Sequence, residues 1–360
     1  MADNIDMVAR GSFANAVDRL MTVDVPGRGF VPLAYDIARH KCDRSLTQDA
    51  GERLLAAMSE TQAPVVFIVT GATSQRIGLS EWIGEMDGPP GAIALARTLA
   101  LTHRAVPVLL TDPGQGKMLS EAARSLGLYS LPVADVRRQA HATTHTTSIA
   151  VIEIPADAAA AADQAKSLLA DLGPRAAIAI EKAGENECGV FHNSQKADTS
   201  AGKARVDALF RACAGAGVLT IGIGDGGNEI GMGSIKDDLL KVFPHMAVCN
   251  CPCKGSILAD RATDCLIVAT VSNWGAYALA AYVALASGQP YACHTPNREA
   301  RLLDGAARAG YMHMDGFCLP GADGMPEEVH TAFVRMLSTM VHWPPLKHGR
   351  AGYLKDMLPP

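Results

Sequence analysis

The sequence of 360 residues is poor in charged side chains, which make up 19% of the chain, and it has no cluster of lysine and arginine. Charged residues usually account for about a quarter of a globular domain, so this shortage indicates that much of the chain is buried. The net charge of -5 excludes the basic stripe that nucleic-acid binding favours. With 48% hydrophobic residues, we expect a large core and no nucleic-acid partner.

No targeting segment is expected either, because the opening residues MADNIDMVARGSF carry early acidic residues and no long apolar run. Nine cysteines, an odd number, without a secretory signal favour reduced thiols and a cytoplasmic protein. Residues 265–286 are uncharged over a length that can span a bilayer. Ser272, Asn273 and Gly275 interrupt this stretch, so we expect a buried strand, a turn and a buried helix, and no membrane partner.

Apolar runs alternate with alanine-rich stretches after residue 60. The predicted strands are residues 65–69, 106–110, 149–154, 176–180, 218–223 and 266–271. The predicted helices are residues 91–101, 116–126, 156–172, 201–214, 235–242, 297–309 and 326–341. Apolar strands separated by helices predict an open, mostly parallel sheet with helices on both faces, a Rossmann-like three-layer α/β sandwich.

No internal repeat and no long polar linker divides the sequence. We therefore predict one α/β catalytic domain over residues 1–360. Residues 1–60 are expected to form a helical N-terminal extension packed on it, with a break at residues 26–29 (PGRG).

The strongest functional signal follows the strand predicted at residues 218–223. Residues 222–234 (GIGDGGNEIGMGS) combine glycines with Asp225, Asn228 and Glu229. Glycine lets a backbone approach a ligand closely, and the carboxylates can bind a cation or transfer protons. A purely structural turn is the alternative. The G-x-G-x-x-G pattern within this loop is not interpreted as a dinucleotide fingerprint, because the next helix begins only near residue 235 and the unit lies late in the chain.

A second loop leads from Thr70 and Gly71, after the first predicted strand, to Glu85, Asp87 and Gly88. Asp87 can act as a helix cap, but a cap does not explain Glu85. We therefore expect at least one of the two carboxylates to be functional.

The remaining two loops follow the strands that end at residues 180 and 271. Glu181 and Lys182 either form a surface ion pair or belong to the site. Ser272 and Asn273 either cap the following helix or, through free backbone N–H groups, bind a carboxylate or phosphate.

Loops that follow parallel strands meet at one edge of the sheet. We therefore predict that Thr70, Glu85, Glu181, Asp225 and Ser272 line one cleft. The predicted catalytic residues are Asp225, Glu229, Glu85, Asp87 and Glu181. The predicted substrate-binding residues are Thr70, Gly71, Gly88, Lys182, Asn186, Gly224, Gly226, Gly227, Asn228, Ser272 and Asn273.

Three cysteines alternate at Cys249, Cys251 and Cys253. On a strand they would share one face, whereas zinc sites usually use Cys-x2-Cys pairs, and no second pair follows. The spacing therefore predicts reduced, metal-free cysteines.

Four segments carry a resemblance to a known family: residues 85–92 (EMDGPPGA), 222–233 (GIGDGGNEIGMG), 271–277 (VSNWGAY) and 323–330 (DGMPEEVH). They resemble, in this order, the C-terminal domain of D-glutamate cyclases, over about residues 65–330. The resemblance implies an enzyme that converts D-glutamate to 5-oxo-D-proline and water without ATP. Longer members carry a hydratase-like N-terminal domain that these residues do not include, and residues 72–84 differ from the Pro-rich stretch usual in the family.

This reaction joins the α-amine of glutamate to its own γ-carboxylate and needs a base together with an acid or Lewis acid. An acidic cluster of Asp225 and Glu229, with Glu85 or Asp87, is predicted to hold the ammonium group, act as base, or bind Mg²⁺ or Mn²⁺. Lys182 and the helix start at Ser272 and Asn273 are predicted to hold carboxylates. The turn that contains Asp323 is expected to lie far from this cluster.

No cofactor other than such a divalent cation is expected, and the predicted partner is a small amino or carboxylic acid. Two other functions are alternatives: a non-catalytic module that binds a nucleotide or an amino acid, and a cofactor-dependent dehydrogenase. A homo-oligomer is left open.

Overall fold

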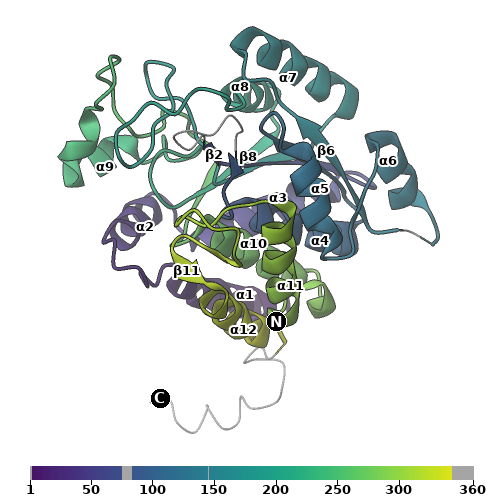
Figure 1. Ribbon diagram of the computed structural model, residues 1–360. Helices are drawn as coiled ribbons and strands as arrows, with labels where there is room; N and C mark the ends of the chain where they lie inside the picture. Colours follow the sequence, from purple (N-terminus) through teal and green to yellow (C-terminus); the bar gives the residue numbers. More distant parts are fainter. Residues whose placement is uncertain (1, 75–82, 145, 343–360) are drawn as a thin grey trace, which may run out of the picture.

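The computed structural model describes residues 2–74, 83–144 and 146–342. Its centre is a seven-stranded sheet whose pairings are all parallel (Figure 1). Across the sheet the strands are β5 (Tyr129–Ser130), β6 (Ser148–Glu153), β4 (Val106–Thr111), β1 (Val65–Thr70), β7 (Ala176–Ile180), β8 (Leu219–Gly224) and β9 (Cys265–Val268). Two small antiparallel pairs lie outside this sheet: β2 (Thr73–Ser74) with β3 (Ile83–Gly84), and β10 (Gly321–Ala322) with β11 (Met325–Pro326).

Helices cover both faces of the sheet (Figure 1). One face packs against α6 (Val133–His141), α7 (Ala158–Leu172) and α8 (Asp207–Gly215). The other packs against α2 (Val31–His40), α3 (Leu46–Ser59), α4 (Pro89–His103), α5 (Gly116–Arg124) and α10 (Ser272–Ala286). On these helices pack α1 (Ala2–Met21), α11 (Pro296–Ala309) and α12 (Glu327–His342). In β1, Phe67 and Val69 face the first group of helices, whereas Val66 and Ile68 face the second. The predicted three-layer α/β fold is therefore confirmed.

The predicted strands and helices after residue 60 are all present, with shifted ends. Helix α8 begins at Asp207 rather than residue 201, because the preceding backbone bonds elsewhere: the N–H of Arg205 donates to the carbonyl of Pro155 (3.1 Å). Strand β9 ends at Val268, since the N–H of Thr270 donates to the carbonyl of Met21 in α1 (2.8 Å). Helix α6 and strand β5 were not predicted, because they are short and contribute few buried side chains.

Without β5, the strands numbered by their order in the chain lie across the sheet in the order 3-2-1-4-5-6, that is β6, β4, β1, β7, β8 and β9. The direction of winding reverses between β1 and β7, which are neighbours in the sheet. In open parallel sheets the two loops at such a reversal diverge and leave a crevice at the carboxyl ends of the strands. This topology predicts a ligand site at the loops after Thr70 and Ile180.

The first 60 residues share the core of the sheet domain. Helices α1 and α3 both pack against α10, and α3 also contacts β9. Residues 26–29 separate α1 from α2, as predicted. Residues 265–286 divide into β9 and the buried helix α10, and no helix in the described part of the chain combines the length and apolarity required to cross a bilayer.

Candidate active site

Three acidic side chains meet at the carboxyl edge of the sheet. Asp87 precedes α4, Glu181 follows β7 and Asp225 follows β8. One carboxylate oxygen from each lies within 4.8 Å of the other two. Loops far apart in the sequence therefore converge at the carboxyl edge of the sheet, where the topology predicts a ligand site. Carboxylate oxygens at this spacing can bind one cation, either an ammonium group or a hard divalent metal ion.

Asp87 and Asn273 cap each other's helices. The carboxylate of Asp87 accepts hydrogen bonds from the N–H groups of Ser272 (3.0 Å) and Asn273 (2.9 Å) at the start of α10. In return, the side-chain oxygen of Asn273 accepts from the N–H groups of Gly88 (3.0 Å) and Gly91 (2.7 Å) at the start of α4. The protein's own carboxylate thus occupies the helix start that the sequence predicts to hold a substrate carboxylate.

Replacing Asn273 with Ala is expected to lower the free energy of unfolding by about 2 kcal/mol, because it leaves the buried N–H of Gly91 in α4 without its acceptor, whereas the N–H of Gly88 keeps Asp87 (2.9 Å). The side-chain amide also donates to the carbonyl of Met86 (3.1 Å), which loses its donor. Chemical denaturation measures the change. Asn297 is the matched control, since it is likewise the second residue of a helix but is exposed. Equal stability of Asn273→Ala and Asn297→Ala would contradict the reciprocal cap.

The carboxylate of Glu229 stabilises its own loop, the glycine-rich loop at residues 222–234, by accepting hydrogen bonds from the loop backbone. Its two oxygens accept hydrogen bonds from the N–H groups of Asp225 (3.2 Å), Gly226 (2.7 Å) and Gly227 (2.7 Å). Gly227 has φ +97°, and a Cβ there would lie 2.5 Å from Leu258, so only glycine fits. The N–H groups that would cradle a phosphate are therefore bound to Glu229, which is not among the three converging carboxylates.

Burial dominates the electrostatics of the three carboxyl groups. Loss of solvation raises the pKa of Asp87, Glu181 and Asp225 well above their usual values. Neighbouring carboxylates raise these pKa values further: Asp323 acts on Asp87, Glu229 on Glu181, and Glu181 on Asp225. A cluster of this kind favours either bound protons or a bound cation.

Arg28 and Asp323 complete the cluster, and the sequence analysis missed both. A guanidinium nitrogen of Arg28 lies 3.0 Å from Asp323 and 3.8 Å from Asp225. Asp323 sits at the turn between β10 and β11 with φ +55°, a conformation unfavourable for Asp. The expectation that this turn lies far from the cluster is wrong, because Asp323 pairs with Arg28 beside Asp225. Arg28 and Asp323 come from opposite ends of the chain, so sequence distance did not indicate this contact. Two sequence features could have indicated these residues: the break at residues 26–29 (PGRG) contains Arg28, and the segment at residues 323–330 (DGMPEEVH) begins with Asp323.

Glu181 is the half-buried member of the three carboxylates. The hydroxyl of Ser272 donates to it (2.6 Å), and its own backbone has φ +49°. A Cβ on Gly88 would lie 2.9 Å from the Cβ of Glu181 and 2.7 Å from the hydroxyl of Thr70. The strained backbone and tight packing fix the direction of this side chain, as is common for functional residues.

Lys182 is buried and does not fit the predicted contact with a substrate carboxylate. Its ammonium group forms an ion pair with Asp112 and donates to the carbonyl of Gly71 (2.8 Å). Asp112 also accepts from the hydroxyl of Thr73 (3.0 Å) and the N–H of Ala204 (2.7 Å). This pair joins the loops after β1, β4 and β7. Asp112 was not predicted, although it lies two residues after the strand predicted at residues 106–110 and directly after β4.

The other predicted binding residues divide into two groups. The side-chain amides of Asn186 and Asn228 already bond the protein backbone. Asn186 donates to the carbonyl of Ser256 (2.8 Å), and Asn228 donates to the carbonyl of His192 (2.9 Å). Gly224 ends β8 beside Glu229. In contrast, the buried hydroxyl of Thr70 finds no hydrogen-bond partner among the described residues. The hydroxyl of Thr70 is therefore available to bond a ligand at the carboxyl end of β1.

Glu85 is not one of the three converging carboxylates, and it interacts electrostatically with Lys203. The N–H of Glu85 donates to the carbonyl of Ala72 (2.8 Å). Lys203 is buried, which lowers its pKa, while Glu85 and Asp112 act in the opposite direction. Lys203 lies in a turn before α8 and donates to the hydroxyl of Thr199 (3.2 Å). The sequence analysis placed it in a helix and missed it as a candidate.

Comparisons with known proteins identify the family of the chain. The family described as "D-glutamate cyclase-like, C-terminal" matches residues 17–338. The chain is also 30% identical over 265 residues to "D-glutamate cyclase, mitochondrial" of Homo sapiens. That alignment covers 72% of this chain and 38% of the human protein, so the chain spans well under half the length of this relative.

Proposed function

The chain belongs to the D-glutamate cyclase-like C-terminal family, and from this premise we propose that it is an enzyme converting D-glutamate to 5-oxo-D-proline and water without ATP. The observation that carries the proposal is the convergence of the carboxylates of Asp87, Glu181 and Asp225 at the carboxyl edge of the sheet, two of them buried and Glu181 half-buried. Glutamate carries an α-ammonium group, which this acidic cluster is built to bind. A lyase of this type needs a base next to that nitrogen.

In the proposed reaction the α-nitrogen loses a proton and attacks the γ-carboxyl carbon. A C–N bond forms, a C–O bond breaks, and the oxygen leaves as water with the protons released from nitrogen. Glu181 is the proposed base, because it is half-buried, has a raised pKa and is oriented by Ser272. Asp225 and Asp87 hold positive charge beside it, and Lys203 is the proposed partner for a substrate carboxylate.

A divalent cation such as Mg²⁺ or Mn²⁺ is part of the proposal. Asp87 and Asp225 would hold it through oxygen atoms, the ligands that these ions prefer, while Glu181, the third carboxylate of the group, stays free to act as the base. When bound, such an ion would supply a Lewis acid for a carboxylate oxygen. The residue set differs from the one predicted from the sequence, since Glu85 and Glu229 lie outside the converging group.

Binding of this cation is expected to depend on pH. The pKa values of the three carboxyl groups are raised, so the folded protein binds more protons than the unfolded chain between about pH 4 and those raised values. Without a cation, stability therefore falls as pH rises through that window. Saturating Mn²⁺ is expected to raise Tm by roughly 5 °C near pH 8 and much less near pH 5.5. Equal Tm shifts at both pH values, or a Tm shift reproduced by ionic-strength-matched NaCl, would show that Mn²⁺ does not act through these carboxyl groups.

The reaction itself is tested by incubating the protein with D-glutamate, with and without Mn²⁺, in the absence of nucleotides. Chiral chromatography should show 5-oxo-D-proline accumulating in proportion to enzyme, with L-glutamate as the parallel substrate. Binding of D-glutamate by calorimetry without any product would instead support an amino-acid-binding module. A dehydrogenase is not favoured, because Glu229 occupies the glycine-rich N–H groups and the cluster repels phosphates.

A further inference from the structure

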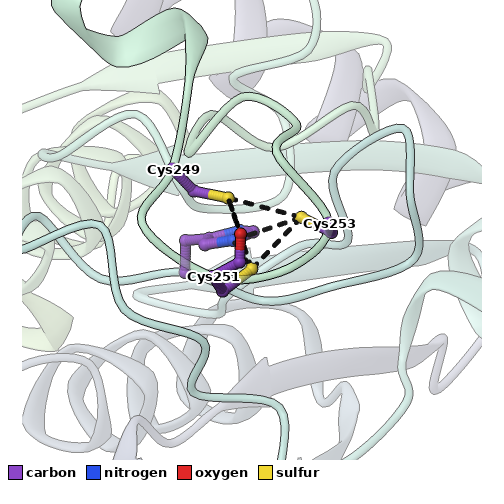
Figure 2. A group of neighbouring side chains, drawn as sticks. Cys249, Cys251 and Cys253 are labelled. Carbon is purple, nitrogen blue, oxygen red and sulfur yellow. Dashed lines mark hydrogen bonds between the residues drawn. The ribbon is translucent and has the colours of Figure 1, made fainter.

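A second group of ligand atoms lies outside the acidic cluster and shares no residue with it. His192 and the cysteines 249, 251 and 253 place one ring nitrogen and three sulfurs within 4.8 Å of one another. Figure 2 shows the three cysteine side chains directed toward a common centre. The sulfur of Cys251 lies 3.3 Å from those of Cys249 and Cys253, and the latter two are 3.4 Å apart.

These cysteines do not lie on a strand. Residues 249–253 form bends and turns between the short helix η1 (Pro244–Ala247) and β9, which is why their alternating positions point inward together. The reasoning that predicted a shared strand face is therefore wrong. The chain folds back so that the N–H of Cys249 donates to the carbonyl of Gly255 (2.8 Å). The N–H of Gly255 in turn donates to the sulfur of Cys253 (3.4 Å), a contact that favours a thiolate.

The spacing fits a tetrahedral metal site better than a disulfide. Sulfur atoms in a disulfide are about 2.05 Å apart, and a disulfide pairs only two cysteines. Zinc bound to thiolates at about 2.3 Å places sulfurs roughly 3.8 Å apart at the corners of a tetrahedron. The Nε2 atom of His192 occupies the fourth corner, 3.4 Å from the sulfur of Cys251 and 3.7 Å from that of Cys253.

His192 supplies an independent indication of a ligand. Its side chain is 1% exposed, and the side-chain contacts described for its ring are the two cysteine sulfurs. The other ring nitrogen, Nδ1, has no hydrogen-bond partner among the described residues. Burying an imidazole among thiols is costly unless something binds it there.

We propose that His192, Cys249, Cys251 and Cys253 bind a structural zinc ion. Three thiolates and one imidazole form a complete tetrahedral set, so no position is left for a substrate or a reactive water. Thiolates select zinc over the hard cations that carboxylates prefer, so this ion is distinct from any held by the acidic cluster.

The ion would join two irregular segments that frame the candidate active site. His192 belongs to residues 181–206 between β7 and α8, and the cysteines belong to the segment before β9. Both segments contact the glycine-rich loop: Asn228 donates to the carbonyl of His192 (2.9 Å), and the N–H of Ala259 donates to the carbonyl of Gly227 (3.0 Å). Long segments without regular structure need such a crosslink to hold one conformation.

The test is the metal content of the full chain, prepared under reducing conditions without chelator. Elemental analysis should find about one zinc per chain, and zinc X-ray absorption should show three sulfurs and one nitrogen. Cys251→Ser should lose the zinc, while Cys188→Ser should retain it. Cys188 is the matched control because it is exposed and its sulfur lies 3.8 Å from the carbonyl of Cys253, outside the ligand set. Removing the ion with a chelator should lower Tm by roughly 5 °C or more.

Wild-type protein that binds neither zinc nor cobalt after reduction and reconstitution would overturn the proposal. A disulfide between any two of the three cysteines in reduced preparations, or zinc retained in Cys251→Ser, would do the same. Should the variant not fold, cobalt substitution in the wild type decides, since tetrahedral thiolate ligation gives intense visible bands. These readouts do not depend on turnover, so failure of the proposed enzymatic activity leaves them interpretable.

Discussion

Replacing Asp225 with Asn is expected to leave the protein folded and to lower kcat/KM for D-glutamate by roughly two orders of magnitude. Asp225 lies in the acidic cluster, within 4.8 Å of the carboxylates of Asp87 and Glu181. If it holds the ammonium group or a metal ion, its negative charge matters more than its shape. Removing one such contact costs a few kcal/mol of transition-state stabilisation.

Folding should survive this change for an electrostatic reason. Burial, together with the carboxylates of Glu181 and Asp323, raises the pKa of Asp225, so the fold already favours its neutral form. Asn is neutral and nearly the same size. Arg28 keeps its closer partner, Asp323, at 3.0 Å.

The control for Asp225→Asn is Asp237→Asn. Asp237 is exposed in the first turn of α9 (Lys236–Val242), so losing its charge should change kcat/KM little. Asp323, which the sequence suggests as a remote control, is unsuitable because it belongs to the cluster. Near-wild-type turnover of Asp225→Asn would show that the catalytic carboxylate lies in another loop. Unfolding of the variant would instead assign Asp225 a purely structural role.

The sheet could be predicted from the sequence because its determinants are local. The runs VVFIV and VPVLL are apolar on both faces, which indicates strands covered on both sides, and each is followed by a helical stretch. From that alternation the parallel sheet and its active edge follow directly. Asp225 and Glu181 were found for the same reason, since each directly follows a strand.

The parts that escaped prediction depend on contacts between distant segments. Arg28 reaches Asp323 across almost the whole chain, and neither residue follows a predicted strand of the sheet. The roles of Glu229 and Lys182 were misjudged because sequence shows that a charge is present but not whether a neighbouring N–H or carboxylate already binds it. The placement of Cys249, Cys251 and Cys253 on one strand face was wrong, because bends and turns, rather than a strand, set the direction of their side chains.

Glu181→Gln should have the largest effect on catalysis within the proposed mechanism. A positioned general base contributes about 10²- to 10⁴-fold, and the amide cannot accept the proton from the substrate nitrogen. The amide oxygen can still accept the hydroxyl hydrogen of Ser272, which donates to Glu181 at 2.6 Å, so the loop should keep its conformation. We therefore expect kcat to fall by two orders of magnitude or more in a folded protein.

The dependence of the rate on pH separates a base from a structural role. Burial raises the pKa of Glu181, with the carboxylates of Glu229 and Asp87 adding to the rise. Because the deprotonated form is the active base, wild-type kcat/KM should increase with pH up to that raised pKa and then level off. Glu181→Gln should lose this rising limb, whereas Glu181→Asp should keep it at a lower rate. Glu185→Gln is the control, since Glu185 lies in the same loop but pairs with Arg205 at 3.2 Å. A rising limb preserved in Glu181→Gln would assign the base to another carboxylate of the cluster, with Asp225 the next candidate.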